Sequence, residues 1–122
     1  MKAGERSSAD FLRDMKDAAL NAVSFVAGVS YEDFRDNTEK VYAVIRALEV
    51  IGEAAKNVPM QQRKRYPSVP WRVVTGMRDK LIHGYFGVDL ERVWETVRDD
   101  LPPLVEVIKI MLTEVHSTET PS

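Results

Sequence analysis

The sequence predicts an all-α protein, an up-and-down bundle of four or five main helices. Apolar residues recur at spacings of three and four along several long stretches, which is the period of an amphipathic helix. Capping residues, glycines and prolines separate these stretches, where helices begin and end. No segment shows the strict alternation of a half-buried strand, and there is no internal repeat or low-complexity tract.

The composition indicates one globular domain, predicted over residues 8–115. A chain of 122 residues with 44% hydrophobic and 30% charged residues can build a single core with a well-solvated surface. Without cysteine there are no disulfides or thiolate metal ligands, and with two histidines we expect no metal site and no cofactor. The segment MKAGERSSAD lacks an apolar signal-like run and no stretch could span a membrane, so a cytoplasmic location is expected.

The net charge of −2 argues mildly against a general nucleic-acid binder. Proteins that hold nucleic acid through phosphate contacts are usually basic. Any contact with RNA must therefore rely on a local patch or on assembly.

The first half of the chain predicts two long helices. Residues 1–7 are expected to be a flexible arm, and Ser7 or Ser8 can cap a helix to about Ala27 that Gly28 ends. Ser30 can cap a short helix, although Asp33 stands where a capping box prefers glutamate or glutamine. The second long helix runs from Asn37 or Thr38 to about Asn57. Its expected inner residues are Val41, Val44, Ile45, Leu48, Ile51, Gly52 and Ala55.

The second half predicts a short turn and further helices. MQQRKRYPSVP is bounded by prolines and should form one helical turn in a loop. A helix then covers most of Trp71–Phe86, with Gly84 able to end it. Asp89 can cap a helix from Leu90 to about Arg98, and the last helix should kink or restart at Pro102-Pro103. Residues 116–122 are expected to be a disordered tail.

Side chains able to do chemistry converge at one place, the predicted end of the helix that begins at Trp71. Arg78, His83 and Tyr85 lie within eight residues there. His83 would stand in the last turn, beside unpaired carbonyls and the negative end of the helix dipole, which favour imidazolium. On this physical ground alone, His83 could simply cap the helix and Tyr85 could close its end by apolar contact.

Three stretches of the chain resemble the HEPN superfamily and, within it, the HepT-like (DUF86) toxin ribonucleases of type VII toxin–antitoxin pairs. They are YEDFRDNTEKVYAVIRALEVIGEAAKNVP, VPWRVVTGMRDKLIHGYFGVD and VWETVRDDLPPL. The most specific element is Arg78-x4-His83-x-Tyr85, which matches the R-x4-H-x-Y motif of that group. Asp79 departs from the pattern, since asparagine often follows the arginine.

The resemblance implies a HEPN-like helical fold and a specific activity. Such proteins are homodimers whose two R-x4-H motifs meet in a cleft and cut RNA without a metal. Their partner is a nucleotidyltransferase-fold antitoxin, which transfers AMP to the motif tyrosine. Arg78 and His83 would then be catalytic and Tyr85 the AMP acceptor. The alternative is a catalytically silent HEPN module that binds a nucleotidyltransferase.

The chemistry gives dimerisation a reason. RNA cleavage through the 2′-OH needs a base, an acid and positive charge on the phosphate. His83 can serve as acid or base and Arg78 supplies a fixed charge, but one histidine cannot do both tasks at once. Two copies that face each other would supply both.

Helical spacing suggests supporting residues. Arg78 and His83 lie five apart, roughly 140° around a helix, whereas Asp79 and His83 share a face. We therefore expect Asp79 to accept a hydrogen bond from the imidazole. Arg78 could form a structural ion pair with Glu49 or Glu53, and Glu53 could equally anchor Arg78 for catalysis.

The one basic cluster comprises Arg63, Lys64 and Arg65, with Arg72 nearby. A charged loop is usually only solvated, but this cluster could also contact RNA or an acidic antitoxin surface. Trp71 and Trp94 lie on apolar faces and are expected to make core or dimer contacts rather than to stack on bases.

Overall fold

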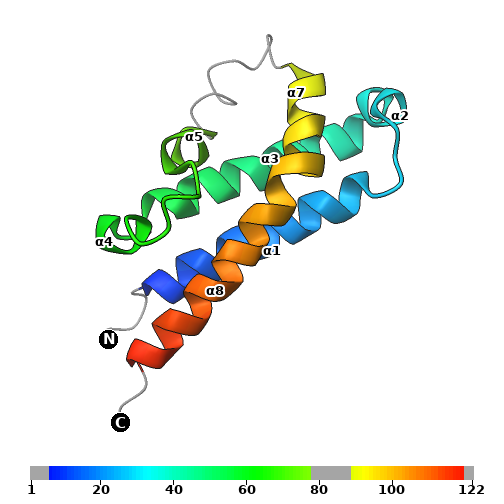
Figure 1. The fold of residues 1–122 in the computed structure, drawn as a ribbon. Helices are drawn as coiled ribbons and strands as arrows, with labels where there is room; N and C mark the ends of the chain where they lie inside the picture. Colours follow the sequence, from blue (N-terminus) through cyan, green and yellow to red (C-terminus); the bar gives the residue numbers. More distant parts are fainter. Residues whose placement is uncertain (1–5, 78–88, 120–122) are drawn as a thin grey trace.

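Helices make up all the regular secondary structure of the residues that the structure describes (Figure 1). The structure, a computed structural model, describes residues 6–77 and 89–119, with side chains up to residue 115. This confirms the all-α prediction. The elements are α1 (Ser8–Val26), α2 (Tyr31–Asp36), α3 (Thr38–Lys56), α4 (Met60–Arg63), α5 (Trp71–Thr75), α7 (Leu90–Glu95), the π-helical turn η2 (Thr96–Asp100) and α8 (Leu101–Glu119).

The first three helices begin at side chains that cap them. Ser7 Oγ accepts a hydrogen bond from the Asp10 amide at 3.2 Å, and the Asp10 carboxylate accepts one from the Ser7 amide at 2.9 Å. Of the two serines considered, Ser7 is therefore the cap, and Asp10 completes a capping box. Ser30 accepts only from the Asp33 amide, and Asn37 caps α3. The predicted starts of these helices are confirmed.

At both ends, the described structure extends beyond the predicted domain limits of residues 8–115. Arg6, assigned to the arm, forms an ion pair of 2.7 Å with Asp14 on α1. Gly28, which follows α1, has a φ of 71°, a left-handed conformation that favours glycine. At the other end, α8 runs to Glu119, so it includes residues 116–119 of the predicted tail.

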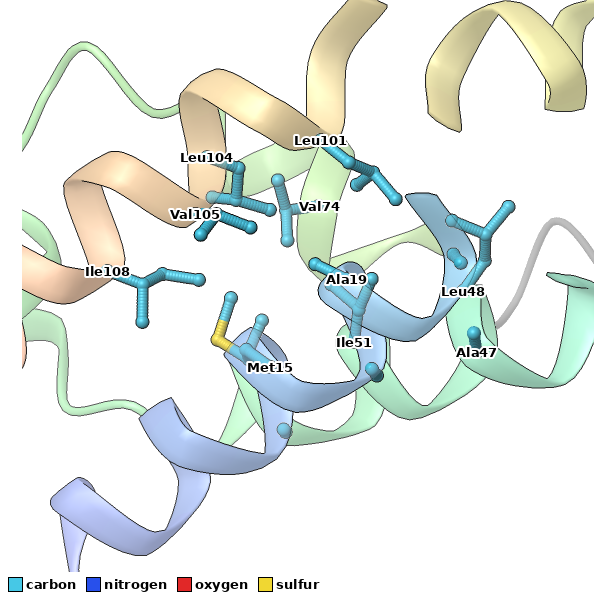
Figure 2. Close-up of a cluster of buried hydrophobic side chains, with 14 of the residues drawn as sticks. Met15, Ala19, Ala47, Leu48, Ile51, Val74, Leu101, Leu104, Val105 and Ile108 are labelled. Carbon is cyan, nitrogen blue, oxygen red and sulfur yellow. The ribbon is translucent and has the colours of Figure 1, made fainter. Parts of the chain in front are cut away.

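The core lies between two layers of helices. The helices α1 and α3 pack along their lengths in one layer, with α8 against α1 and α5 against α3 (Figure 1). Apolar side chains from all four fill the space between them (Figure 2). The labelled residues of this cluster are Met15, Ala19, Ala47, Leu48, Ile51, Val74, Leu101, Leu104, Val105 and Ile108.

The buried face of α3 is close to the predicted one but is shifted around the helix. Val44, Leu48 and Ile51 are buried as expected. Val41 and Ile45 are only half-buried, and Ala47 and Ala54 are buried instead. The shift follows from packing on two sides, because α1 covers one flank of α3 and α5 covers another.

The predicted kink before the last helix is confirmed and has a clear backbone cause. In η2 the Leu101 amide donates to the Thr96 carbonyl, five residues earlier. Pro102 and Pro103 have no amide proton, and their rings would collide with carbonyls four residues earlier in a regular helix. The wider π turn relieves this conflict, and the chain changes direction between α7 and α8 (Figure 1).

Candidate functional site

The predicted catalytic segment, with Arg78, Asp79, His83 and Tyr85, lies outside the described residues. Their roles stay predictions. The structure does describe both flanks of the segment, α5 with Gly76 and Met77 before it and Asp89 with α7 after it.

The flank before the segment is held in the core. Val74 of α5 is buried beside Leu104 and Val105 of α8 (Figure 2). The indole Nε1 of Trp71 donates to the Tyr66 carbonyl at 3.1 Å. Trp71 packs against the core, as its apolar face predicted.

The prediction of an unbroken helix from Trp71 is wrong at Gly76, because α5 ends at Thr75. The Gly76 amide still bonds to the Arg72 carbonyl at 3.2 Å. A Cβ at position 76 would lie 3.2 Å from that same oxygen, closer than side chains usually approach. Glycine thus permits a tight turn, which the sequence pattern did not reveal because an isolated glycine is also tolerated within a helix.

The flank after the segment is fixed by a cap and by aromatic packing. Asp89 Oδ1 accepts a hydrogen bond from the Arg92 amide at 3.1 Å, which confirms the predicted cap of α7. Trp94 meets the Tyr31 ring of α2 edge-on at 5.9 Å, and the Arg98 guanidinium lies 4.3 Å from the Trp94 ring centroid. Trp94 is half-buried against the core, and sequence reasoning missed its two partners.

Glu53 lies near the end of α3 and is half-buried. It lines an open groove of about 430 Å³ between α1 and α3, together with the charged residues Arg6, Asp14 and Lys56. Because Arg78 is not described, anchoring of Arg78 by Glu53 remains a prediction. Glu49, the other acid considered for Arg78, lies 3.6 Å from Arg46 on its own helix.

The basic cluster divides into two parts. Arg63 is half-buried and bonds to the end of α3, with Nε donating to the Val58 carbonyl at 2.8 Å and Nη2 to the Lys56 carbonyl at 3.1 Å. The Lys56 carbonyl is one that the end of a helix leaves unpaired, and Val58 lies two residues beyond that end. Lys64 and Arg65 are exposed, as is Arg72 on α5. Only these three have free access to a partner among the described members of the cluster.

Among the described residues, the groups with a shifted pKa lie in a helix cap, in exposed ion pairs and at one partly buried tyrosine. Burial, with the carboxylate of Glu114 as a second cause, raises the pKa of Tyr66 to about 12. A hydrogen bond of 2.8 Å from Arg98 lowers the pKa of Asp99. Tyr66 lies where the segment before α5 meets α8. Its phenol stays protonated to a higher pH than that of an ordinary tyrosine.

Two features are absent from the residues that the structure describes. Within residues 6–77 and 89–119, no three acidic, histidine or cysteine side chains are grouped as metal ligands would be. Within the same ranges no helix is both long enough and apolar enough to cross a membrane.

The all-helical fold and the R-x4-H-x-Y spacing together define a HEPN-type domain. The model of the family described as "Ribonuclease HepT-like" matches residues 15–111. The chain belongs to this HepT-like family, which confirms the family predicted from its motifs.

Relatives of similar length support the assignment. The chain is 46% identical over 100 residues to a protein of Thermococcus cleftensis named "Probable ribonuclease HepT", across 82% of this chain and 91% of that protein. It is 45% identical over 106 residues to a Methanocaldococcus jannaschii protein named as a candidate RNase, across 87% and 91% of the two chains. A second such M. jannaschii protein is 39% identical over 109 residues, across 89% and 90%. No solved structure matches the chain significantly.

Proposed function

We propose that the protein is a metal-independent endoribonuclease, the toxin of a toxin–antitoxin pair. The family match over residues 15–111 carries this proposal, because it includes the whole segment from Arg78 to Tyr85. The relatives named as ribonucleases point to the same substrate class. The cytoplasm is the expected location of such a pair.

The proposed reaction is attack by the ribose 2′-oxygen on the adjacent phosphorus. The bond from phosphorus to the 5′-oxygen breaks, which leaves a 2′,3′-cyclic phosphate and a 5′-hydroxyl. His83 of one copy takes the 2′-OH proton, and His83 of the second copy gives a proton to the 5′-oxygen. Arg78 holds the phosphate oxygens as negative charge builds on them. Asp79 orients the imidazole and Glu53 anchors Arg78.

The proposed partner is a nucleotidyltransferase-fold antitoxin that modifies Tyr85. The tyrosine oxygen attacks the α-phosphorus of ATP, forms a phosphodiester to AMP and releases pyrophosphate, while the phenol proton passes to solvent. The bulky, charged AMP would then block the cleft. The exposed side chains of Lys64, Arg65 and Arg72 are proposed to contact RNA or the antitoxin.

The decisive test is RNA cleavage by the purified wild-type protein in the presence of EDTA. We expect cleavage with cyclic-phosphate ends, lost in Arg78→Ala and His83→Ala. The matched controls are Arg92→Ala, an exposed arginine of α7, and His116→Ala, the other histidine of the chain. If the wild-type protein leaves RNA intact, the silent-module alternative is favoured and the enzymatic proposal fails.

The modification has its own test. We expect the intact mass of the protein to rise by whole AMP increments when it is co-expressed with a neighbouring nucleotidyltransferase. The increment should be absent from Tyr85→Phe. An unchanged wild-type mass would contradict neutralisation by AMP transfer without touching the cleavage proposal.

A further inference from the structure

The exposed cations that precede the predicted catalytic segment have no partners within the described part of the chain. The side chains of Lys64, Arg65 and Arg72 are exposed, and none of them forms an ion pair or a hydrogen bond with a described residue. They therefore keep their charge available to a partner outside the chain. Five other arginines of the described ranges pair with carboxylates: Arg6 with Asp14, Arg13 with Asp10, Arg35 with Asp36, Arg46 with Glu49 and Arg98 with Asp99.

The stretch that carries these cations has no acidic residue. Residues 54–77 include five basic residues and no aspartate or glutamate. One of the five, Arg63, is held by carbonyls of its own chain. Across the fold, Glu114 of α8 borders a small hollow together with Arg65. We therefore expect Arg65 to attract an anion less strongly than Lys64 and Arg72 do.

Hydrogen bonds hold these cations on a fixed part of the fold. The Trp71 indole donates to the Tyr66 carbonyl at 3.1 Å, and the Val69 amide donates to the same oxygen at 3.1 Å. These bonds join the loop after α4 to the first turn of α5. Arg65 precedes Tyr66 and Arg72 follows Trp71, so both belong to this joined region, which lies at one end of α3 (Figure 1). A cation whose backbone is already fixed loses less conformational freedom when it binds a phosphate.

The flank on the other side of the predicted catalytic segment has the opposite charge. Residues 89–100 carry five acidic residues and two basic ones. Arg92 is exposed there as well, but Glu91 precedes it directly and Glu95 follows it by three residues on α7. Phosphates are neutralised by the first flank and repelled by the second. We therefore expect bound RNA to extend over α4 and α5 rather than over α7.

The residue types favour RNA over an acidic protein as the partner of these cations. Lysine is depleted in protein interfaces, whereas it binds phosphate well as a point charge. Met60 and Val73 are exposed near the cations, at 61% and 60%, but they lie on two different helices. Single exposed apolar side chains are normal on a protein surface and do not by themselves indicate a protein interface.

We propose that Lys64, Arg65 and Arg72 form an RNA-binding surface, here called the α4–α5 surface, which holds phosphates of the substrate away from the bond that is cleaved. The inference rests on the proposed function, because RNA is the substrate of that reaction. It adds residues that bind the substrate without taking part in the chemistry. It also chooses RNA over the antitoxin as the partner of this cluster.

The test measures binding of a single-stranded RNA whose riboses are 2′-O-methylated. Such RNA has no free 2′-OH, so the proposed reaction cannot cleave it. Fluorescence anisotropy gives the Kd for the full chain between about 50 and about 200 mM salt. The triple variant Lys64→Ala, Arg65→Ala, Arg72→Ala should bind roughly tenfold or more weakly than wild type at the lower salt. Its salt dependence, the slope of log K against log salt, should be shallower by about two, since each phosphate contact with a single strand contributes about 0.7.

The matched control removes the same amount of charge elsewhere. The triple variant Arg46→Ala, Arg92→Ala, Lys109→Ala takes exposed cations from α3, α7 and α8. It should bind the RNA within about threefold of wild type, because charges farther away than about 8–10 Å are largely screened. Circular dichroism checks that both triple variants are folded. If the two variants bind RNA equally, net charge rather than the α4–α5 surface attracts RNA, and the proposal is wrong.

Cleavage of unmodified RNA separates the α4–α5 surface from the proposed function. We expect the KM of the Lys64, Arg65 and Arg72 variant to rise with little change in kcat, because binding is lost equally in the ground and transition states. A lower kcat with unchanged KM and Kd would place these residues in the chemistry and overturn the proposal. If wild type binds RNA through this surface but does not cleave it, the proposed function fails and the surface remains an RNA-binding site.

Co-expression with the neighbouring nucleotidyltransferase tests the competing partner. We expect the variant of the α4–α5 surface to copurify with that protein as wild type does. If the variant instead binds RNA with the wild-type Kd and no longer copurifies, the surface belongs to an acidic protein partner and the proposal fails.

Discussion

Substitution of Arg63 tests whether this member of the basic cluster stabilises the fold, unlike the exposed Lys64, Arg65 and Arg72. Its guanidinium donates to the carbonyl of Lys56, the last residue of α3, and to that of Val58, two residues further on. Replacing it with alanine would leave both carbonyls without this donor. We therefore expect Arg63→Ala to destabilise the fold, whereas a solvated member of a charged loop would tolerate the change.

The magnitude follows from the two bonds. A hydrogen bond that involves a charged group contributes about 1.5–3 kcal/mol when it is well shielded. Arg63 is half-buried, and water can replace part of each bond, so we expect a total loss of about 1–2 kcal/mol. For a chain of this size, 1 kcal/mol corresponds to roughly 4 °C in Tm. The expected fall in Tm is therefore roughly 4–8 °C.

The assay is thermal and urea unfolding followed by circular dichroism. Lys64→Ala, an exposed neighbour, is the matched control and should change stability by less than about 0.5 kcal/mol. Arg63→Lys should fall between the two, because one ammonium cannot reproduce the planar fork of the guanidinium. Equal unfolding curves for Arg63→Ala and Lys64→Ala would refute a structural role for Arg63.

Three further changes test the fold. Asp89→Ala removes the cap of α7 and should cost about 1 kcal/mol in urea unfolding; no loss would mean that the bond to the Arg92 amide adds nothing. Ile51→Ala empties a fully buried position between the layers, with an expected loss of about 2–5 kcal/mol by the same measurement. Tyr66 has a pKa of about 12 in the folded state, against an ordinary value of 10.0. Its protonated phenol therefore contributes to the stability of the fold in full below pH 10, and this contribution is lost as the pH rises toward 12. Tyr66→Phe should lack that part of the alkaline loss, and parallel pH profiles of wild type and variant would contradict it.

The helix starts could be predicted from the sequence because each depends on a local bond. Ser30, Asn37 and Asp89 each accept a hydrogen bond from the amide three residues later, so a short window contains all the information. The kink near Pro102 is equally local, since proline removes its own amide proton.

The contacts that the sequence did not predict depend on how the helices and loops meet in the folded protein. The role of Arg63 depends on where the end of α3 lies. The cluster of Tyr31, Trp94 and Arg98 depends on α2 meeting α7. A signal existed for Arg63, because a helix end leaves carbonyls unpaired and an arginine follows within seven residues. No local rule predicts the meeting of α2 and α7.

The net charge of −2 is the sum of two regions of unlike charge, which lie at opposite ends of α3. Residues 56–72, at one end, carry five basic residues and no acidic one, whereas residues 32–40, at the other end, carry four acidic residues and two basic ones. The 19 residues of α3 hold these regions roughly 28 Å apart.

At physiological ionic strength electrostatic effects fade over about 8 Å, so RNA near the basic end is screened from the acidic end. The overall acidity therefore does not oppose RNA cleavage by a chain whose predicted catalytic segment begins six residues after Arg72.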